Sequence, residues 1–167
     1  MEQNLLSLSA KVGSILFARG YTISTAESCT GGLLSHSLTG IAGSSAYFIG
    51  GVVAYSNQIK VQALGVQEQT LIEFGAVSEQ TASEMAQGIR SRFNTDIGLS
   101  TTGIAGPTGG TVDKPVGLVW IGISTPDGTQ AYACNFKGDR LEVMRRTVME
   151  ILNCLLTHLK GYKLTKN

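Results

Sequence analysis

Apolar residues near the start of the chain recur every three to four positions, in the pattern of an amphipathic helix. This pattern predicts a first helix from Asn4 to Arg19 that stops at Gly20. The segment Tyr21–Ala26 then alternates and is rich in strand formers, and a second helix is expected from about Gly31. The chain therefore begins as helix, strand, helix.

Further strands and helices are predicted in the middle of the chain. The short apolar run Gly50–Tyr55 is typical of a buried strand, and Ser56 after it can cap a helix. Ser78 can cap another helix, over Glu79–Phe93. Asp96–Thr101 predicts a further strand. The alternation of strands and helices thus continues.

A long glycine-rich loop precedes the last elements. Gly103–Pro115 holds four glycines and two prolines in 13 residues, and a loop of that length inside a compact domain is usually functional. After it, Gly117–Ser124 and Thr129–Phe136 predict a hairpin across the turn at 126–128. Arg140–Leu159 predicts a closing helix.

These elements predict a layered α/β/α fold with a mixed sheet, in a single domain over residues 1–167 with a core from about 4 to 160. The chain is 43% hydrophobic and 15% charged, which excludes a disordered protein. A net charge of +1 supplies no field for binding a long nucleic acid, but a small anionic ligand stays possible. The polar start is unlike a signal peptide, and no apolar run approaches the roughly 20 residues of a membrane span. We expect no membrane partner and a cytoplasmic location.

The cysteines and histidines argue against metal or histidine-assisted chemistry. Three cysteines, an odd number without metal-ligand spacing, favour a reducing compartment: Cys29, Cys134 and Cys154. His36 and His158 are far apart in helix-like surroundings, where packing or surface roles are commoner than catalysis. We expect neither a metal nor a cofactor.

Ser28 is a candidate nucleophile because it lies where a strand would meet a helix, in the stretch TAESCTGG. Three residues then open the helix: Thr30, Gly31 and Gly32. Their free backbone N–H groups would stabilise an anion or a developing oxyanion beside the hydroxyl. The alternative is an N-cap serine in a tight turn. Cys29 is a rival nucleophile, although neighbouring side chains at a strand exit point in opposite directions.

Lys60 is the best-placed base for a serine nucleophile, since it follows the apolar strand by one helical turn. A lysine with its ordinary pKa of about 10.4 is almost fully charged at pH 7. Lowering that pKa by roughly 3 would cost about 4 kcal/mol and requires burial; a solvated helix lysine is the alternative. Ser56, four residues earlier, is a second possible nucleophile, and Tyr55 could donate or relay a proton.

The loop over residues 102–110 resembles a phosphate cradle but matches neither the Walker A nor the dinucleotide pattern. Glycines such as Gly103 allow backbone amides to approach an anion closely. Arg140 is a natural partner for an oxyanion or phosphate, and Lys114 a weaker one. Asp139 and Arg140 could equally form an ordinary capping pair.

Several blocks, in order, resemble the CinA C-terminal domain family, whose characterised members include nicotinamide mononucleotide deamidases of the PncC type. The similarity runs from the first helix to about residue 157, and many relatives carry a further N-terminal domain. The blocks are Ala26–Gly32, Gly43–Ser45, Tyr55–Asn57 with Lys60, Gly75–Ser78, Gly103–Pro107, Lys114–Gly117 and Gly138–Arg140.

The resemblance implies hydrolysis of nicotinamide mononucleotide to nicotinate mononucleotide and ammonia, in pyridine-nucleotide salvage. It implies a catalytic pair of Ser28 and Lys60 with Tyr55 nearby, and substrate or oxyanion contacts at Thr102 and Arg140. It also implies a homo-oligomer, a dimer or larger.

Two other hypotheses stay open at this point. The chain could be a non-catalytic module that binds a phosphorylated ligand or a protein partner in competence or DNA-damage pathways, as the family name suggests. It could also be a cysteine hydrolase that uses Cys29.

Overall fold

A computed structural model describes residues 2–161, so Met1 and residues 162–167 of the predicted domain lie outside the described residues. Within that part of the chain, five strands and six α-helices are found. In order they are α1 (Glu2–Arg19), β1 (Ile23–Glu27), α2 (Leu33–Thr39), the short 3-10 helix η1 (Ser44–Ala46), β2 (Phe48–Val53), α3 (Asn57–Leu64), α4 (Glu68–Glu73), α5 (Glu79–Phe93), β3 (Ile97–Gly103), β4 (Leu118–Thr125), β5 (Gly128–Asn135) and α6 (Arg140–Gly161).

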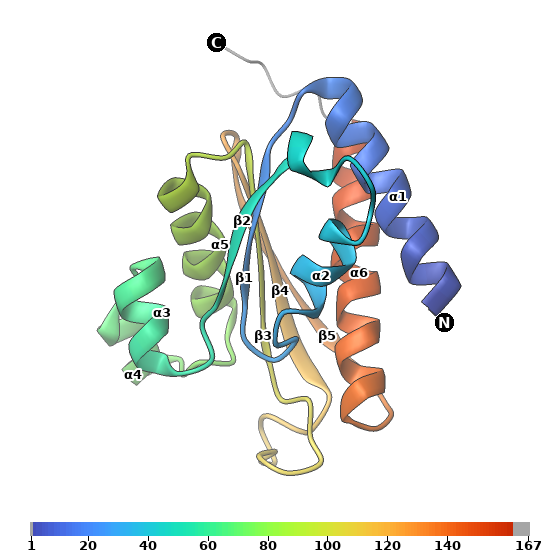
Figure 1. Ribbon diagram of the computed structural model, residues 1–167. Coiled ribbons are helices and arrows are strands. Elements are labelled where there is room, and N and C mark those ends of the chain that lie inside the picture. Colours follow the sequence, from blue (N-terminus) through green and yellow to red (C-terminus); the bar gives the residue numbers. More distant parts are fainter. Residues whose placement is uncertain (1, 162–167) are drawn as a thin grey trace.

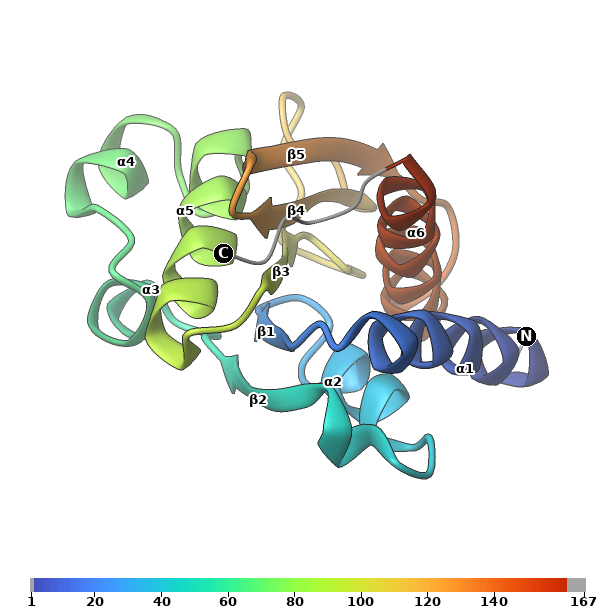
Figure 2. The same ribbon diagram turned by 90° about the horizontal axis from the view of Figure 1, so that it is seen from above.

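The five strands form one mixed sheet in the order β2-β1-β3-β4-β5. β1 is parallel to β2 and β3, whereas β4 is antiparallel to β3 and to β5. Helices α3, α4 and α5 lie on one side of the sheet and α1, α2 and α6 on the other (Figures 1 and 2). The predicted layered α/β/α architecture with a mixed sheet is thereby confirmed.

Two apolar clusters hold the layers together. The larger cluster lies under α1, α2 and α6 and includes Leu16, Leu99 and Ile151. The smaller lies under α3 and α5 and includes Leu64 and Met85. The predicted strand is found as β1, and because both faces of the central strands are covered, it is buried at all five positions, polar residues included.

β2 differs from the buried strand predicted over Gly50–Tyr55. It runs over Phe48–Val53 at the edge of the sheet, and its residues alternate between half-buried and exposed. Ile49 and Val53 are each 48% exposed. An apolar run indicates burial on average, but edge position is decided by strand order, which no local pattern encodes.

α2 begins at Leu33 and not at Gly31 as predicted. Gly31 and Gly32 have φ angles of 59° and 101°, in the left-handed region that excludes them from the helix. The short helix α4 follows α3 and was not expected from the sequence pattern.

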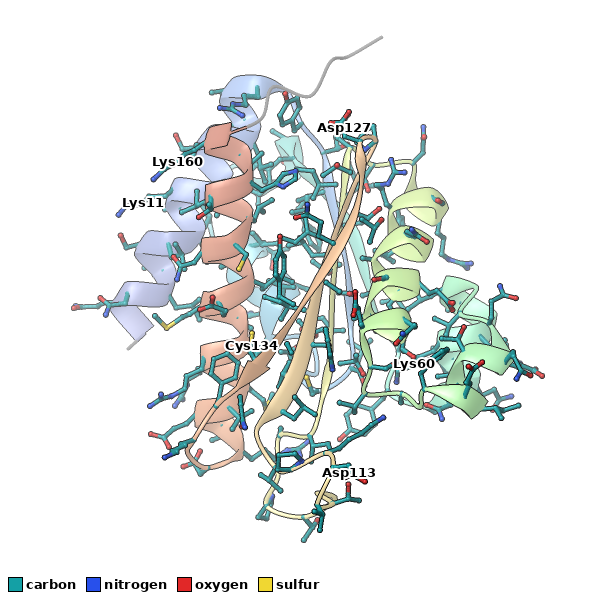
Figure 3. The ribbon with its side chains drawn as sticks, turned by 180° about the vertical axis from the view of Figure 1, so that it is seen from behind. Lys11, Lys60, Asp113, Asp127, Cys134 and Lys160 are labelled. Carbon is teal, nitrogen blue, oxygen red and sulfur yellow. The ribbon has the colours of Figure 1, made fainter. Side chains whose placement is uncertain are left out.

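The carboxyl ends of the parallel strands β1, β2 and β3 meet at one edge of the sheet, where open α/β sheets usually bind ligands. In Figure 3 the loop after β3, marked by Asp113, extends from this edge, and the β4–β5 turn, marked by Asp127, lies at the opposite end. Lys60 lies on the side of the sheet that carries α3 and α5 (Figure 3). In the described part of the chain, no helix is both long and apolar enough to cross a membrane.

Candidate active site

Ser28 is the first residue after β1, in a turn that leads to α2. Its amide donates to the Thr101 carbonyl oxygen at 2.9 Å, and its carbonyl accepts from the Gly31 amide at 3.2 Å. The side chain is 9% exposed and faces a cavity. Ser28 is therefore held from both sides by backbone hydrogen bonds.

The N–H groups predicted to be free in this turn are partly used by the protein itself. The Gly31 amide donates to the Ser28 carbonyl, and the Gly32 amide donates to the Glu27 carboxylate at 3.0 Å. Since the amides of Gly31 and Gly32 already donate to other groups of the protein, the prediction that they are free is wrong for these two residues. A buried carboxylate must be satisfied by donors, and the nearest are the amides at the start of α2.

Lys60 lies on α3 and reaches back over the end of β2. Its amine nitrogen Nζ lies 3.1 Å from the Ser28 hydroxyl oxygen, 2.8 Å from the Ala54 carbonyl oxygen and 3.2 Å from that of Tyr55. The lysine is 1% exposed. A charged Lys60 can donate to all three oxygens. A neutral amine has two N–H bonds for the two carbonyls and one lone pair, which could then accept from the Ser28 hydroxyl.

Burial lowers the pKa of Lys60, because the charged ammonium loses hydration in this position. A negative charge on Cys29 would oppose this effect and is the smaller influence. The solvated helix lysine, which was the alternative interpretation of this residue, is excluded by its burial.

Ser56 has a different role from Ser28. Its hydroxyl oxygen accepts a hydrogen bond from the Ile59 amide at 3.2 Å and so caps α3. Lys60 therefore pairs with Ser28, directly after β1, whereas Ser56 caps the helix that carries Lys60.

Cys29 is a poor rival nucleophile. It is 6% exposed, and burial raises the pKa of its thiol to about 12. The thiol is therefore protonated near neutral pH, where only the thiolate would attack a carbonyl.

Six of the nine predicted site residues surround one cavity of about 290 Å³ at the carboxyl edge of the sheet. They are Ser28, Tyr55, Lys60, Thr102, Gly103 and Arg140. The other three predicted residues, in the turn after Ser28, do not line it. Another hollow of about 420 Å³, between α1, α2 and α6, contains none of the predicted residues.

Arg140 and Tyr55 meet at the mouth of this cavity. The Arg140 guanidinium donates to the Tyr55 hydroxyl and to the Gly106 carbonyl, each at 2.9 Å. Tyr55 is 62% exposed. Asp139 caps α6, because its carboxylate accepts a hydrogen bond from the Glu142 amide at 2.9 Å. The Arg140 side chain contacts Tyr55 and Gly106 instead, so the alternative of an ordinary capping pair applies to Asp139 alone.

The two remaining predicted residues of the wall are at the end of β3. The Thr102 hydroxyl donates to the Ala76 carbonyl at 2.7 Å, and the residue is 1% exposed. A side chain at Gly103 would overlap β4 at Val119, so glycine lets the wall pack closely. Lys114 donates to the Phe74 carbonyl at 2.6 Å and does not line the cavity.

Sequence reasoning missed three functional candidates. Asn57 and Thr108 line the cavity, and Glu27 is fully buried directly before Ser28. Glu27 and Asn57 lie inside two of the sequence blocks that resemble the CinA C-terminal domain family, and this position was the signal that could have identified them. Within residues 2–161, no group of three or more His, Cys, Asp or Glu side chains is placed to hold a metal ion.

Comparison with known proteins gives a consistent result. The family model of the CinA C-terminal domain matches residues 5–159. A CinA-like protein from Cyanothece is 55% identical over 134 residues, which cover 80% of this chain and 32% of the relative. A CinA-like protein from Kosmotoga olearia is 52% identical over 147 residues, which cover 88% and 36%. The chain thus spans about a third of the length of these curated relatives.

Solved structures match over nearly their whole length. A competence/damage inducible protein from Agrobacterium tumefaciens superposes with a TM-score of 0.91 at 40% identity, covering 94% of this chain and 96% of that one. A competence-damaged protein (CinA) superfamily protein from Escherichia coli superposes with a TM-score of 0.90 at 31% identity, covering 95% and 92%.

Proposed function

Since this chain belongs to the CinA C-terminal domain family, we propose that it is a serine amidohydrolase that converts nicotinamide mononucleotide to nicotinate mononucleotide and ammonia. The observation that carries the proposal is the 3.1 Å approach of the buried Lys60 amine to the Ser28 hydroxyl. A nucleophile within hydrogen-bond reach of a base whose pKa is lowered by burial is the arrangement that covalent catalysis needs.

In the proposed first step, the Ser28 oxygen attacks the carboxamide carbon while neutral Lys60 takes the hydroxyl proton. The tetrahedral intermediate then collapses, and as the C–N bond breaks the Lys60 ammonium gives its proton to the amide nitrogen, which leaves as ammonia. Lys60 then takes a proton from water, and the resulting hydroxide attacks the ester carbon. As the bond between that carbon and the Ser28 oxygen breaks, Lys60 returns the proton to the serine oxygen and the acid is released. The carbonyls of Ala54 and Tyr55 hold the amine in place through each proton transfer.

The oxyanion of that intermediate needs donors other than Gly31 and Gly32, whose amides are occupied. The amide of the residue directly after the nucleophile supplies one such donor in other serine hydrolases, and here this residue, Cys29, lines the cavity. We assign this amide to the oxyanion.

The cavity suits a small anionic substrate. Among the described residues, its lining includes the Arg140 guanidinium and no acidic residue. Arg140 uses two of its five N–H bonds on Tyr55 and Gly106, so further donors are available for a phosphate. Its volume of about 290 Å³ is close to the lower end of ordinary ligand pockets.

The test combines turnover and binding. The purified protein is incubated with nicotinamide mononucleotide, ammonia is measured, and calorimetric titration with the same nucleotide is run alongside. Ammonia release by the wild type and its loss in Lys60→Ala support the amidohydrolase. Heat of binding without ammonia release would overturn it and favour the non-catalytic module.

A further inference from the structure

Glu27, the residue before Ser28, is a fully buried carboxylate with 0% exposure. One of its oxygens, Oε2, accepts from the Thr30 hydroxyl at 2.7 Å and from the amides of Gly32 and Leu34, each at 3.0 Å. The other, Oε1, accepts from the Ser35 amide at 2.8 Å and the Ser35 hydroxyl at 2.6 Å. Five donors therefore converge on a group that can only accept, which stabilises it without water.

These five bonds connect Glu27 to both ends of the nucleophile turn. Thr30 and Gly32 belong to the turn itself, and the other donors belong to the first residues of α2. The Thr30 hydroxyl also bonds the Thr101 hydroxyl at 2.7 Å, and the Thr101 carbonyl holds the Ser28 amide at 2.9 Å. The position of Ser28 is thus fixed through the network that ends on the Glu27 carboxylate.

The backbone of Glu27 reaches the other member of the catalytic pair. Its carbonyl accepts from the Ala54 amide at 2.7 Å, and the Ala54 carbonyl in turn accepts from Lys60 Nζ at 2.8 Å. One residue therefore lies at the junction of the two chains of contacts that set the distance between hydroxyl and amine.

We infer that Glu27 is a positioning residue for the reaction, which holds the Ser28 hydroxyl within reach of Lys60; the inference rests on the proposed function. A simple helix cap would need only the bonds to α2, which Leu34 and Ser35 supply. The bonds to Thr30 and Gly32 instead restrain the turn that bears the nucleophile. Burial raises the pKa of the neighbouring Cys29 thiol, and the Glu27 carboxylate adds a smaller contribution in the same direction.

Two kinds of variant test this role. Glu27→Gln keeps the shape but brings an NH₂ group against backbone N–H donors. Thr30→Val removes only the hydroxyl that ties the turn to the carboxylate, and Thr30→Ser restores it. Ser35→Ala is the matched control, because it removes a hydroxyl donor to the same carboxylate from a position outside the turn.

We expect Glu27→Gln to lower kcat for ammonia release at least about a hundredfold and Thr30→Val about tenfold, since small displacements of reacting groups are costly. KM should stay within about twofold, and Thr30→Ser and Ser35→Ala should keep kcat within about threefold, because neither changes the turn. Circular dichroism verifies that each variant is folded. A folded Thr30→Val variant with wild-type kcat would overturn the inference.

Crystal structures of Glu27→Gln and Thr30→Val give a readout that does not depend on turnover. The inference predicts that the Ser28 oxygen moves out of hydrogen-bond distance of Lys60 Nζ in both. Retention of the 3.1 Å separation in both would refute it. If the wild type releases no ammonia, the proposed function fails, and these structures still decide whether Glu27 positions the serine.

Discussion

At the scale of single residues, the environment of Lys60 is the feature on which the proposed chemistry depends. The side chain is buried, its amine contacts two carbonyls and one hydroxyl, and burial lowers its pKa. A neutral amine is well satisfied there, whereas an ammonium loses hydration that three neutral oxygens replace only in part.

The first prediction is a rise of activity with pH. Because Lys60 acts as a base only when neutral, kcat/KM should increase through its lowered pKa and reach a plateau below its ordinary value of 10.5. Lys60→Arg should lose activity at least about a thousandfold at every pH, since a guanidinium stays protonated. A pH–rate profile measures both; an active Lys60→Arg variant would contradict the assignment.

The second prediction concerns stability. A folded-state pKa below the unfolded one means that the unfolded chain binds more protons between those two values, so stability rises with pH in that window. In that window, the free energy of unfolding of the wild type should rise relative to that of Lys60→Met by up to about 1.4 kcal/mol per pH unit. Urea unfolding at several pH values up to 10.5 tests this. A difference between the two proteins that does not change with pH would show that Lys60 is not perturbed.

The third prediction separates the two adjacent nucleophiles. With a pKa of about 12, the Cys29 thiol should resist iodoacetamide at pH 7.5, and the treated enzyme should keep its activity. Mass spectrometry of the tryptic peptides locates any alkylation. Inactivation that follows alkylation of Cys29 would support the cysteine hydrolase instead.

Residue chemistry was only partly predictable from the sequence. Ser28 and Lys60 could be paired from the sequence because Ser28 follows one predicted strand and Lys60 lies one helical turn after the next, so both fall near the same edge of the sheet. The family resemblance implies the same pair. The bonds of Gly31 and Gly32 could not be foreseen, because the Gly31 bond to the Ser28 carbonyl depends on the path of the turn and the Gly32 bond depends on the position of the Glu27 carboxylate.

At the scale of elements, the contact between α3 and α5 places Lys60. Gly88 of α5 lies against the end of α3, and a Cβ there would overlap the Leu64 carbonyl oxygen. Since a backbone oxygen cannot move away without moving its helix, the two helices can approach this closely only at a glycine.

The fourth prediction follows from that contact. Gly88→Ala should lower the free energy of unfolding by about 1–3 kcal/mol, as overpacking does, and reduce kcat by shifting α3. Gln87→Ala, at the exposed neighbouring position, should change stability by less than about 0.5 kcal/mol. Thermal unfolding and ammonia release are measured on both. Equal stability of the two variants would contradict the packing argument.

Element boundaries were best predicted where both ends carry local signals. α5 runs over Glu79–Phe93 as expected, because Ser78 caps its start and Asn94, with a φ of 50°, ends it. β2 was placed two residues late and taken as buried, since strand order is a property of the whole sheet.

At the scale of the whole molecule, the site is assembled from segments far apart in the sequence. The end of β1, the start of α3, the end of β3 and the start of α6 meet at the carboxyl edge of the sheet, beside the loop after β3. The length of that loop already indicated a functional role in the sequence. Its contact with Arg140, through the Gly106 carbonyl, could be recognised only once the fold was known.

A fifth prediction concerns assembly, which the resemblance implies. We propose a homo-oligomer, so light scattering on a size-exclusion column should give at least twice the 17.6 kDa of one chain. A mass of one chain at micromolar concentration would contradict it.

The central claim is that Ser28 is the nucleophile, and the most direct test compares two serines. Ammonia release from nicotinamide mononucleotide is measured for Ser28→Ala and for Ser56→Ala, which removes the helix cap. Ser28→Ala should lower kcat at least about a thousandfold. Ser56→Ala should keep most activity while losing about 1 kcal/mol of stability. Near-native turnover by a folded Ser28→Ala variant would contradict the account.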